Sequence, residues 1–435
     1  MEKHNFLLIL LFLLQFPISI ASSNETDQLA LLAFQNLITN PNHFLANNWT
    51  KNTSLCSWFG VTCTPKTQRV VALIPPAVGN ATKMMNFSLS GNRVSGNIPK
   101  EVSNLGHLAL LSLFDNQLTS FIPRTLFNIS LLLAVSLSFN SLSGPLLLDE
   151  GNIVSNLKSL SISNNQISGC IPSNICQLTE LKILSIAFNN ITEDIPINID
   201  CLSELQEFYI GNNPIKGTIP TSLGNISTLQ YFHCQNNRIV GQIPPELGKL
   251  SNLRQLSLEL NYNLTGQIPK AIFNISSFEI IDFSFNNLSG RIPTTIGLHL
   301  PYLKELYLGA NQLEGEIPLF ITNASKLVIL DLAQNFLTGT IPTNLGNLRE
   351  LQGLLLHDNQ LTNEPREHEL RFFNSLADCR MLKYLQVGNN LLNGTFPNSI
   401  GNLSSTIENF HIADAHINGL IPTSIGNMSG LMPRP

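Results

Sequence analysis

The chain has 435 residues, of which 12% are charged, and its formal net charge at pH 7 is -5. Ordinary soluble domains carry about 25% charged residues, and this chain is too poor in lysine and arginine to offer a basic stripe to phosphates. Nucleic acid is therefore excluded as an expected partner.

Residues 1–22 have the composition of a secretory signal peptide. Lys3 and His4 precede an apolar run over residues 6–14, and the small residues Ala21 and Ser22 follow. The apolar run is too short to cross a bilayer, although an uncleaved anchor is the alternative. We expect a protein of the secretory pathway.

Residues 23–66 differ in composition from the rest of the chain. Residues 27–34 read as a short helix that begins at an aspartate cap, and Trp49 and Trp58 follow. A solenoid must close its open apolar end with a special segment. We expect these residues to be the N-terminal cap of a repeat region.

From residue 67 to residue 429 an asparagine recurs within the frame L-x-x-L-x-L-x-x-N-x-L, mostly every 24 or 25 residues. A fixed period in this range predicts a solenoid of about 14 coils. The asparagines are Asn92, Asn116, Asn140, Asn165, Asn189, Asn213, Asn237, Asn261, Asn286, Asn311, Asn335, Asn359 and Asn390.

Each coil is predicted to contain a strand, an inward turn and a return segment. Leu330 and Leu332 alternate with Asp331, so the leucines should face the interior and Asp331 the solvent on the concave side. Asn335 should then turn inward and bond backbone groups of its own and neighbouring coils, forming a structural ladder with its equivalents. A glycine and a proline lead the chain around the convex side.

The cap and the repeat frame together resemble the extracellular region of plant leucine-rich repeat receptor kinases. The matching cap residues are Leu31, Leu32, Phe34, Trp49, Cys56, Trp58, Gly60, Val61 and Cys63, and Gly-x-Ile-Pro turns match at 217–220, 241–244 and 339–342. The resemblance implies an α/β solenoid: a right-handed leucine-rich repeat superhelix with a parallel β-sheet on its concave face. It also implies a cap held by a Cys56–Cys63 disulfide.

Three places depart from the repeat frame. Ile74-Pro75-Pro76 stands where a further strand is expected, residues 363–381 replace one Gly-x-Ile-Pro turn, and Ala415 takes an asparagine position. We expect the charged insertion to form a short helix on the convex side, as solvated decoration. A similar insertion is familiar from the receptor-kinase subfamily that includes immune receptors for bacterial peptides. Residues 430–435 carry no closing cap, so we expect a fragment or a truncated gene product.

Seven cysteines behind a signal peptide indicate disulfides with at least one cysteine left over. Cys176 can pair with Cys170 on the same convex turn or with Cys201 on the next coil, and the sequence leaves this open. Cys234 and Cys379 occupy inward positions, which predicts buried thiols.

No catalytic signature is present in the sequence. It contains no P-loop, H-E-x-x-H, G-x-S-x-G or kinase motif, and a repeat scaffold lacks an enclosed pocket. His411, Asp414 and His416 can be read as a metal site, but their positions in the coil need not converge. We expect no enzymatic activity, metal or cofactor within these residues.

Residues on the solvent side of the strands are the candidates for ligand contact. Rigid aromatic rings give a large contact area at low entropic cost and can anchor an extended peptide. Phe139, Phe188 and Phe285 directly precede ladder asparagines and are explained equally well as wall residues. The preferred ligand-binding residues stand at the central strand position: Tyr209, His233, Asp282, Tyr307 and Asp331.

Acceptor sequons are dense, which predicts a glycosylated extracellular surface with more than half of the sites occupied. The expected acceptors are Asn48, Asn52, Asn80, Asn128, Asn190, Asn225, Asn263, Asn274, Asn287, Asn323, Asn393, Asn402 and Asn427. Asn24 and Asn86 also stand in sequons, and Asn86 lies within a strand frame.

Three hypotheses for function remain. By resemblance, the first is the ligand-recognition domain of a plant receptor-like kinase or receptor-like protein at the extracellular face of the plasma membrane. It would bind a peptide or microbial ligand and recruit a co-receptor kinase of the same repeat class. The second is a soluble apoplastic inhibitor of pathogen cell-wall-degrading enzymes. The third is a non-functional truncated copy.

Overall fold

The computed structural model describes residues 74–148 and 156–428, together with residues 54, 62–63, 70–71 and 430. The predictions of a signal peptide, a cap helix and a Cys56–Cys63 disulfide lie outside the described residues. Of the cap region, the backbone of β1 (Thr62–Cys63) pairs antiparallel with β2 (Val70–Val71). The chain divides into two compact units, residues 1–191 and residues 192–435, and each is described by itself.

Unit 1 contains two sets of parallel strands and short 3-10 helices. The inner strands are β3 (Asn86–Ser88), β5 (Leu110–Ser112), β7 (Ala134–Ser136), β9 (Ser159–Ser161) and β11 (Ile183–Ser185). The lateral strands are β4 (Ser95–Gly96), β6 (Gln117–Ser120), β8 (Ser141–Pro145), β10 (Gln166–Gly169) and β12 (Asn190–Ile191). The helices are η2 (Pro76–Asn80), η3 (Lys100–Asn104), η4 (Arg124–Asn128) and η5 (Ser173–Gln177).

Unit 2 repeats this arrangement over more coils. Its inner strands are β13 (Glu207–Tyr209), β14 (Tyr231–His233), β16 (Gln255–Ser257), β18 (Ile280–Asp282), β20 (Glu305–Tyr307), β22 (Ile329–Asp331), β24 (Gly353–Leu355), β25 (Tyr384–Gln386) and β26 (Asn409–His411). Its lateral strands are β15 (Val240–Gln242), β17 (Asn263–Gln267), β19 (Asn287–Arg291), β21 (Gln312–Glu316) and β23 (Phe336–Thr338).

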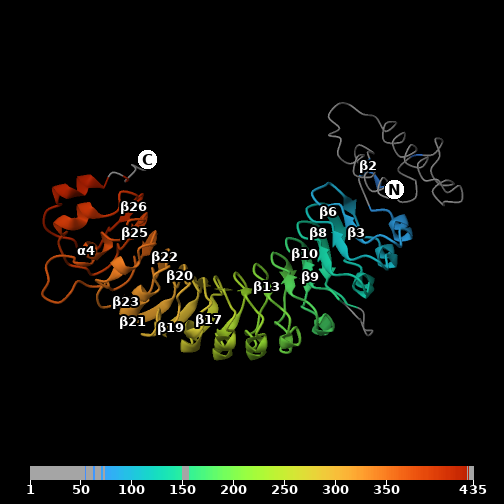
Figure 1. Ribbon diagram of the computed structural model, residues 1–435, viewed down its shortest axis with the longest axis horizontal. Coiled ribbons are helices and arrows are strands. Elements are labelled where there is room, and N and C mark those ends of the chain that lie inside the picture. The colour runs from blue at the N-terminus through green and yellow to red at the C-terminus, as the bar shows by residue number, and fades with distance from the viewer. Residues whose placement is uncertain are drawn as a thin grey trace. The chain divides into compact units, whose positions relative to one another are not determined.

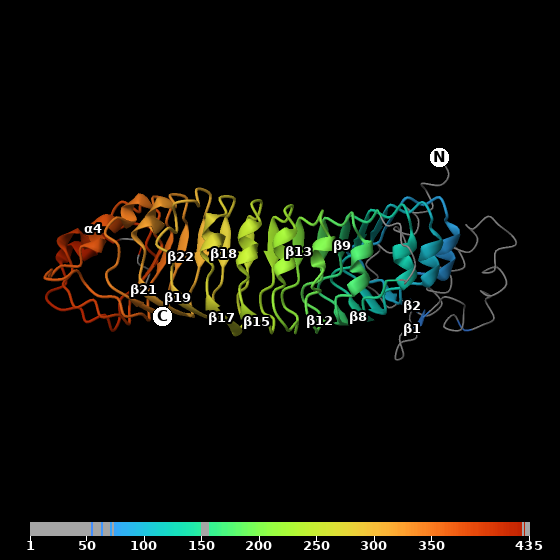
Figure 2. The ribbon, with the colours of Figure 1, turned by 90° about the horizontal axis from the view of Figure 1, so that it is seen from below.

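The outer side of unit 2 carries the helices. They are η6 (Ile199–Cys201), η7 (Thr221–Asn225), η8 (Pro245–Lys249), η9 (Lys270–Asn274), η10 (Leu319–Asn323), η11 (Leu345–Asn347), α4 (Phe372–Leu376), η12 (Asn398–Asn402) and η13 (Thr423–Asn427). Figure 1 shows the inner strands of unit 2 following one another from green to red, and Figure 2 shows the helices along the opposite side. The predicted solenoid with a parallel sheet on its concave face is confirmed.

The inner strands alternate between core and solvent. In β20 and just beyond it, Leu306 and Leu308 are fully buried, whereas Tyr307 between them is partly exposed. This is the period of two that a strand imposes on its side chains. Every second residue of the inner strands therefore faces outward and forms the concave surface of the unit.

The turn after each strand depends on a residue in the left-handed region. Phe285, Ala310 and Gln334 directly precede ladder asparagines and have φ values of 53°, 54° and 55°. The left-handed backbone conformation costs a non-glycine residue roughly 1 kcal/mol. Because residues as different as phenylalanine, alanine and glutamine adopt it, the geometry of the coil and not the side chain imposes this conformation. The turn directs the following asparagine side chain into the interior.

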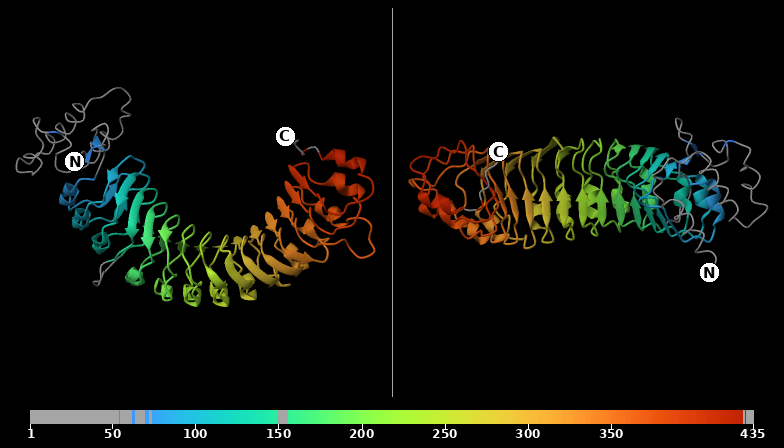
Figure 3. Two further views of the ribbon diagram at one scale, coloured as in Figure 1. Left: turned by 180° about the vertical axis from the view of Figure 1, so that it is seen from behind. Right: turned by 90° about the horizontal axis from the view of Figure 1, so that it is seen from above.

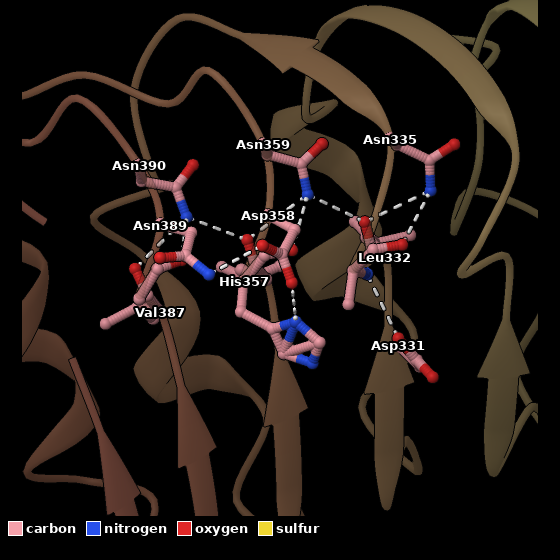
Figure 4. Close-up of polar contacts among 12 residues, drawn as sticks. Asp331, Leu332, Asn335, His357, Asp358, Asn359, Val387, Asn389 and Asn390 are labelled. Carbon is pink, nitrogen blue, oxygen red and sulfur yellow. Dashed lines mark hydrogen bonds and ion pairs between the residues drawn. The ribbon is translucent and has the colours of Figure 1, made fainter. Parts of the chain in front are cut away.

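Asn311 illustrates how each ladder asparagine joins neighbouring coils. Its Nδ2 donates to the carbonyl oxygens of Leu308 and Gly309 at 3.1 Å each and to that of Phe283, in the preceding coil, at 2.9 Å. Its Oδ1 accepts from the N–H of Leu288 at 3.0 Å. Figure 4 shows Nδ2 of Asn335 and Nδ2 of Asn359, on successive coils, donating to the same carbonyl oxygen of Leu332, and Nδ2 of Asn390 donating to that of Val387.

The last described coil lacks this interaction because Ala415 occupies the asparagine position and is buried. In the coils from Asn237 to Asn390 the asparagine oxygen accepts from a backbone N–H of the preceding coil, as Asn390 does from Leu361, and the equivalent donor here is Leu392. We expect Ala415→Asn to raise the free energy of unfolding by about 1 kcal/mol, measured by urea titration. Ala415→Leu adds bulk without an amide and serves as the control; an equal or greater gain with leucine would contradict the hydrogen-bonding explanation.

The insertion at 363–381 has an exposed charged part, which includes Arg366, His368 and Glu369, and a helical part that packs into the interior. The predicted helix is present as α4, and its residues Phe372, Phe373 and Leu376 are buried. The Phe373 ring lies 5.7 Å from that of Phe396, centroid to centroid, and the N–H of Gly346 donates to Ser375 Oγ at 2.7 Å. The interpretation of the insertion as solvated decoration is therefore wrong for α4, because its apolar residues fill the space between adjacent coils.

Candidate functional site

The five preferred residues stand in one row across the inner strands of unit 2. Tyr209 pairs in register with His233, then Ser257, Asp282, Tyr307 and Asp331 follow on successive strands. The right-hand view of Figure 3 shows these parallel strands side by side. We refer to Tyr209, His233, Ser257, Asp282, Tyr307 and Asp331 as the central row.

The first two members of the central row form an aromatic pair. The Tyr209 and His233 rings are 5.1 Å apart, edge to face, and His233 Nε2 lies 3.1 Å from Gln255 Oε1. Burial lowers the pKa of His233, opposed by the Gln255 hydrogen bond and the charge of Asp282. Burial and the nearby Glu207 carboxylate raise the pKa of Tyr209. Both rings are therefore neutral at physiological pH.

Asp282 is held by its own strand through one carboxylate oxygen. Its Oδ1 accepts from Ser284 N at 3.0 Å and from Ser284 Oγ at 2.6 Å. Burial raises the pKa of Asp282 despite these bonds, and the charge of Glu305 adds to the shift. Burial raises the pKa of Glu259, which lies one coil before Asp282, and the charge of Asp282 and a side-chain hydrogen bond with it add to this shift. Glu259 and Asp282 are therefore in direct contact, and the two carboxyls do not favour carrying full charge together.

Tyr307 and Asp331 occupy the next two strands. Tyr307 Oη donates to Glu305 Oε2 at 3.0 Å, and burial followed by the Glu305 charge raises the Tyr307 pKa. Asp331 Oδ1 accepts from Ala333 N at 3.0 Å, and burial raises the pKa of this carboxyl as well. Asp331 thus repeats the setting of Asp282 on the far side of the Tyr307 ring.

A glycine leaves room beside these two side chains. A Cβ atom at Gly309 would lie 2.8 Å from Asp331 Oδ1 and 3.2 Å from its Oδ2, so the carboxylate occupies space that a side chain would fill. Neither Gly309 nor the Glu305 partner of Tyr307 was predicted from the sequence. The available signal was their regular offset of two residues from the central row, which places them on the same face.

The corresponding face of unit 1 has a different chemistry. Its central strand positions hold serines in register on all five inner strands: Ser88, Ser112, Ser136, Ser161 and Ser185. Some of these hydroxyls bond serines two positions further along the neighbouring strand, as Ser112 does with Ser90 at 2.6 Å. Phe139 and Phe188 are exposed beside this row, as Phe285 is in unit 2. Aromatic and acidic side chains at the central position are therefore a property of unit 2.

A family model described as a leucine-rich repeat region matches residues 147–382, more than half of the chain. The chain belongs to the leucine-rich repeat family. A leucine rich repeat N-terminal domain model also matches residues 24–64, and a further leucine-rich repeat model matches residues 381–403.

Relatives of this leucine-rich repeat chain are plant receptors. The leucine-rich repeat receptor-like serine/threonine-protein kinase EFR of Arabidopsis thaliana is 34% identical over 82 residues, which cover 16% of this chain and 8% of that protein. The plant peptide hormone receptor RGFR1, solved in complex with RGF2, superposes with a TM-score of 0.71 at 29% identity, covering 83% of this chain and 60% of that one.

A second solved structure is the Arabidopsis receptor kinase HAESA in complex with the peptide hormone IDA and the co-receptor SERK1. It superposes with a TM-score of 0.69 at 25% identity, covering 94% of this chain and 76% of that one. The leucine-rich repeat chain is thus homologous to the extracellular regions of plant receptor kinases, and it spans less than a tenth of the curated kinase and about three fifths of RGFR1.

The sequons of this leucine-rich repeat protein avoid the central row. Every predicted acceptor within residues 74–148 and 156–428 is exposed. In unit 2 most of them end a 3-10 helix, as Asn225 and Asn274 do, or lie on lateral strands, as Asn263 and Asn287 do. Asn86, on inner strand β3, belongs to unit 1. Glycans at the unit 2 positions would leave its inner strands uncovered.

The cysteines are now distinguished by their state. Cys176 and Cys201 are disulfide-bonded, whereas Cys170 is a free, exposed thiol, so its pairing with Cys176 is excluded. Cys234 and Cys379 are free and buried, as predicted. Burial raises the pKa of each of these two thiols to about 12, which suits a packing role rather than a reactive one.

Two further properties concern the part of the chain that the structure describes. No helix there is long and apolar enough to cross a membrane. No group of three His, Cys, Asp or Glu side chains there is placed to hold a metal ion, which includes His411, Asp414 and His416.

Proposed function

We propose that the chain is the extracellular recognition region of a plant receptor of the leucine-rich repeat class, and that the central row of unit 2 binds an extended peptide. Tyr209, His233, Asp282, Tyr307 and Asp331 would contact this ligand. The observation that carries the proposal is the strict register of these side chains across adjacent strands. Parallel strands about 4.8 Å apart present such a row at a spacing that one extended peptide can follow.

Two further observations support this function. The aromatic members are neutral and their rings are only partly buried, which leaves surface available to a partner. The predicted glycosylation sites of unit 2 lie away from the row, so sugar chains would not block access to it. In the homologous receptors RGFR1 and HAESA, the solved complexes contain peptide hormones.

The wider organisation is part of the same proposal. Residues 1–22 would direct the chain into the secretory pathway, residues 23–66 would cap the solenoid, and residues 67–429 would form its coils. The described chain would supply recognition without catalysis, at the extracellular face of the plasma membrane, and a co-receptor kinase of the same repeat class would join the ligand-bound form. HAESA is seen with the co-receptor SERK1.

The central row is tested by the double variant Tyr209→Ala/Tyr307→Ala. Peptides are selected on the secreted wild-type chain from a phage-displayed library of random 12-residue sequences, and their dissociation constants are measured by fluorescence anisotropy. We expect the double variant to bind the selected peptides at least about ten-fold more weakly, because aromatic anchors dominate such interfaces. The matched control is Tyr262→Ala, since Tyr262 is exposed but lies outside the row. Equal affinity of the double variant and the wild type would refute the proposed site.

A further inference from the structure

We propose that Asp282, Tyr307 and Asp331 form a cradle for one basic side chain, arginine or lysine, of the bound peptide. This inference rests on the proposed function and specifies the chemistry of the ligand. We refer to these three residues as the cation cradle.

The geometry of the cradle follows from the strand register. Asp282 and Asp331 are each paired with Tyr307 on the strand between them. Two strand spacings place their backbones about 10 Å apart, with the tyrosine ring in the middle, and the Asp331 carboxylate lies in the space that the absent side chain of Gly309 leaves just beyond the tyrosine strand. A guanidinium or ammonium group between them would meet a carboxylate on either side and an aromatic ring below, and both contacts attract a cation.

The carboxylates of the cradle are fixed before a ligand binds. Oδ1 of Asp282 and Oδ1 of Asp331 accept from N–H groups two residues further along the chain, just beyond their strands. Asp282 also takes part in a side-chain hydrogen bond with Glu259, whereas Asp331 is held through Oδ1. A group held in this way is organised before binding, which lowers the entropic cost of recognition.

Within the described residues, the carboxylates on this face have no cationic side chain paired with them. No ion pair there involves Asp282, Asp331 or Glu259. Arg254 and Lys304 stand on neighbouring coils but both bond Glu279, at 3.3 and 2.8 Å. Partly buried carboxylates without a cationic partner are costly to maintain. A basic ligand group would supply the missing charge.

The surrounding groups favour an organic cation. The charged and titratable groups that act on the two cradle carboxyls, besides each other and Tyr307, are Glu259, Glu305, His233 and His357. The pKa of Asp282 and that of Asp331 are both raised by burial, as is usual for carboxyls that lack a counter-charge. Three side chains suited to a metal ion do not converge here or elsewhere in the described residues.

The test uses peptides selected as above on the wild-type chain, with counter-selection on Tyr209→Ala/Tyr307→Ala so that only central-row binders remain. We expect the retained peptides to be enriched in arginine or lysine. In the tightest of them, each arginine is replaced by citrulline, which keeps the shape and removes the charge, and each lysine by norleucine. One of these replacements should weaken binding about ten-fold or more.

The receptor side of the test is Asp282→Asn/Asp331→Asn. Asparagine keeps the Oδ1 acceptor for Ser284 and Ala333, so the strands are retained, which circular dichroism and thermal melting would verify. This variant should lose about ten-fold in affinity for the charged peptide and bind the citrulline or norleucine peptide as the wild type does. Glu314→Gln/Glu316→Gln removes the same net charge from exposed positions on β21 and should leave affinity unchanged.

The possible failures are distinguishable. If central-row peptides carry no excess of basic residues, or if neutral replacement leaves their affinity unchanged, the cradle is refuted while peptide binding stands. If no selected peptide distinguishes the wild type from the tyrosine double variant, the proposed function fails and the cradle falls with it.

Discussion

Replacing Asn311 by alanine is expected to lower the free energy of unfolding by about 3–5 kcal/mol. The substitution removes one carboxamide but four hydrogen bonds, three from Nδ2 to carbonyl oxygens and one from Leu288 N to Oδ1. Asn311 and Leu288 are buried, so water cannot replace those bonds without opening the coil. A buried polar group that loses its partner costs roughly 1–3 kcal/mol, and several groups are affected here.

The measurement is a urea titration followed by circular dichroism. The matched control is Gln312→Ala at the next position, where an exposed side chain makes one hydrogen bond, at 3.2 Å to Asn287 Oδ1; its effect should stay below about 0.5 kcal/mol. A loss below about 1 kcal/mol in Asn311→Ala would show that the ladder does not hold adjacent coils together. Because each coil contacts only its neighbours, the damage should be greatest around this coil, which hydrogen exchange would locate.

The second large effect is expected at Phe373, in the insertion. Phe373→Ala should cost about 3–5 kcal/mol, the usual range for truncating a buried phenylalanine. The ring is fully buried and lies 4.2 Å from that of Phe372, 5.7 Å from that of Phe396 and 6.2 Å from that of Phe410, between centroids. Its removal leaves a cavity between the insertion and the coils that follow it.

The control for this substitution is Phe320→Ala on η10, because Phe320 has the same chemistry but an exposed ring. It should change the free energy of unfolding by less than about 1 kcal/mol. Near-ultraviolet circular dichroism would report the loss of fixed aromatic packing in the first variant and its retention in the second. Similar stability of the two variants would contradict the prediction that the Phe373 ring joins the insertion to the coils that follow it.

The coil architecture was predictable because it depends on a local pattern repeated many times. The period of Asn286, Asn311 and Asn335 and the alternation of Leu330, Asp331 and Leu332 predict strand, turn and buried face, and these elements are confirmed. The same period assigned Tyr209, Asp282 and Tyr307 to the solvent side of their strands. Repetition strengthens such inferences, because every coil must place a strand, an inward turn and a buried apolar face at the same positions.

The details of the site required the three-dimensional structure. Which carboxylates have a counter-charge depends on where Arg254 and Lys304 reach, and both reach Glu279. The filling of the space at Gly309 by the Asp331 carboxylate depends on the direction of a side chain from the next coil. Neither fact is visible in residue spacing.

The insertion was partly predictable from the sequence and partly understood only from the three-dimensional structure. Its charged residues and its break of the period identified residues 363–381 as an addition, and the residue pattern was enough to predict a helix there. That Phe372, Phe373 and Leu376 enter the core became visible only in the folded chain. The reason is physical: the repeat pattern specifies which face of a coil is apolar, whereas the burial of an irregular segment depends on the space left between the coils on either side of it.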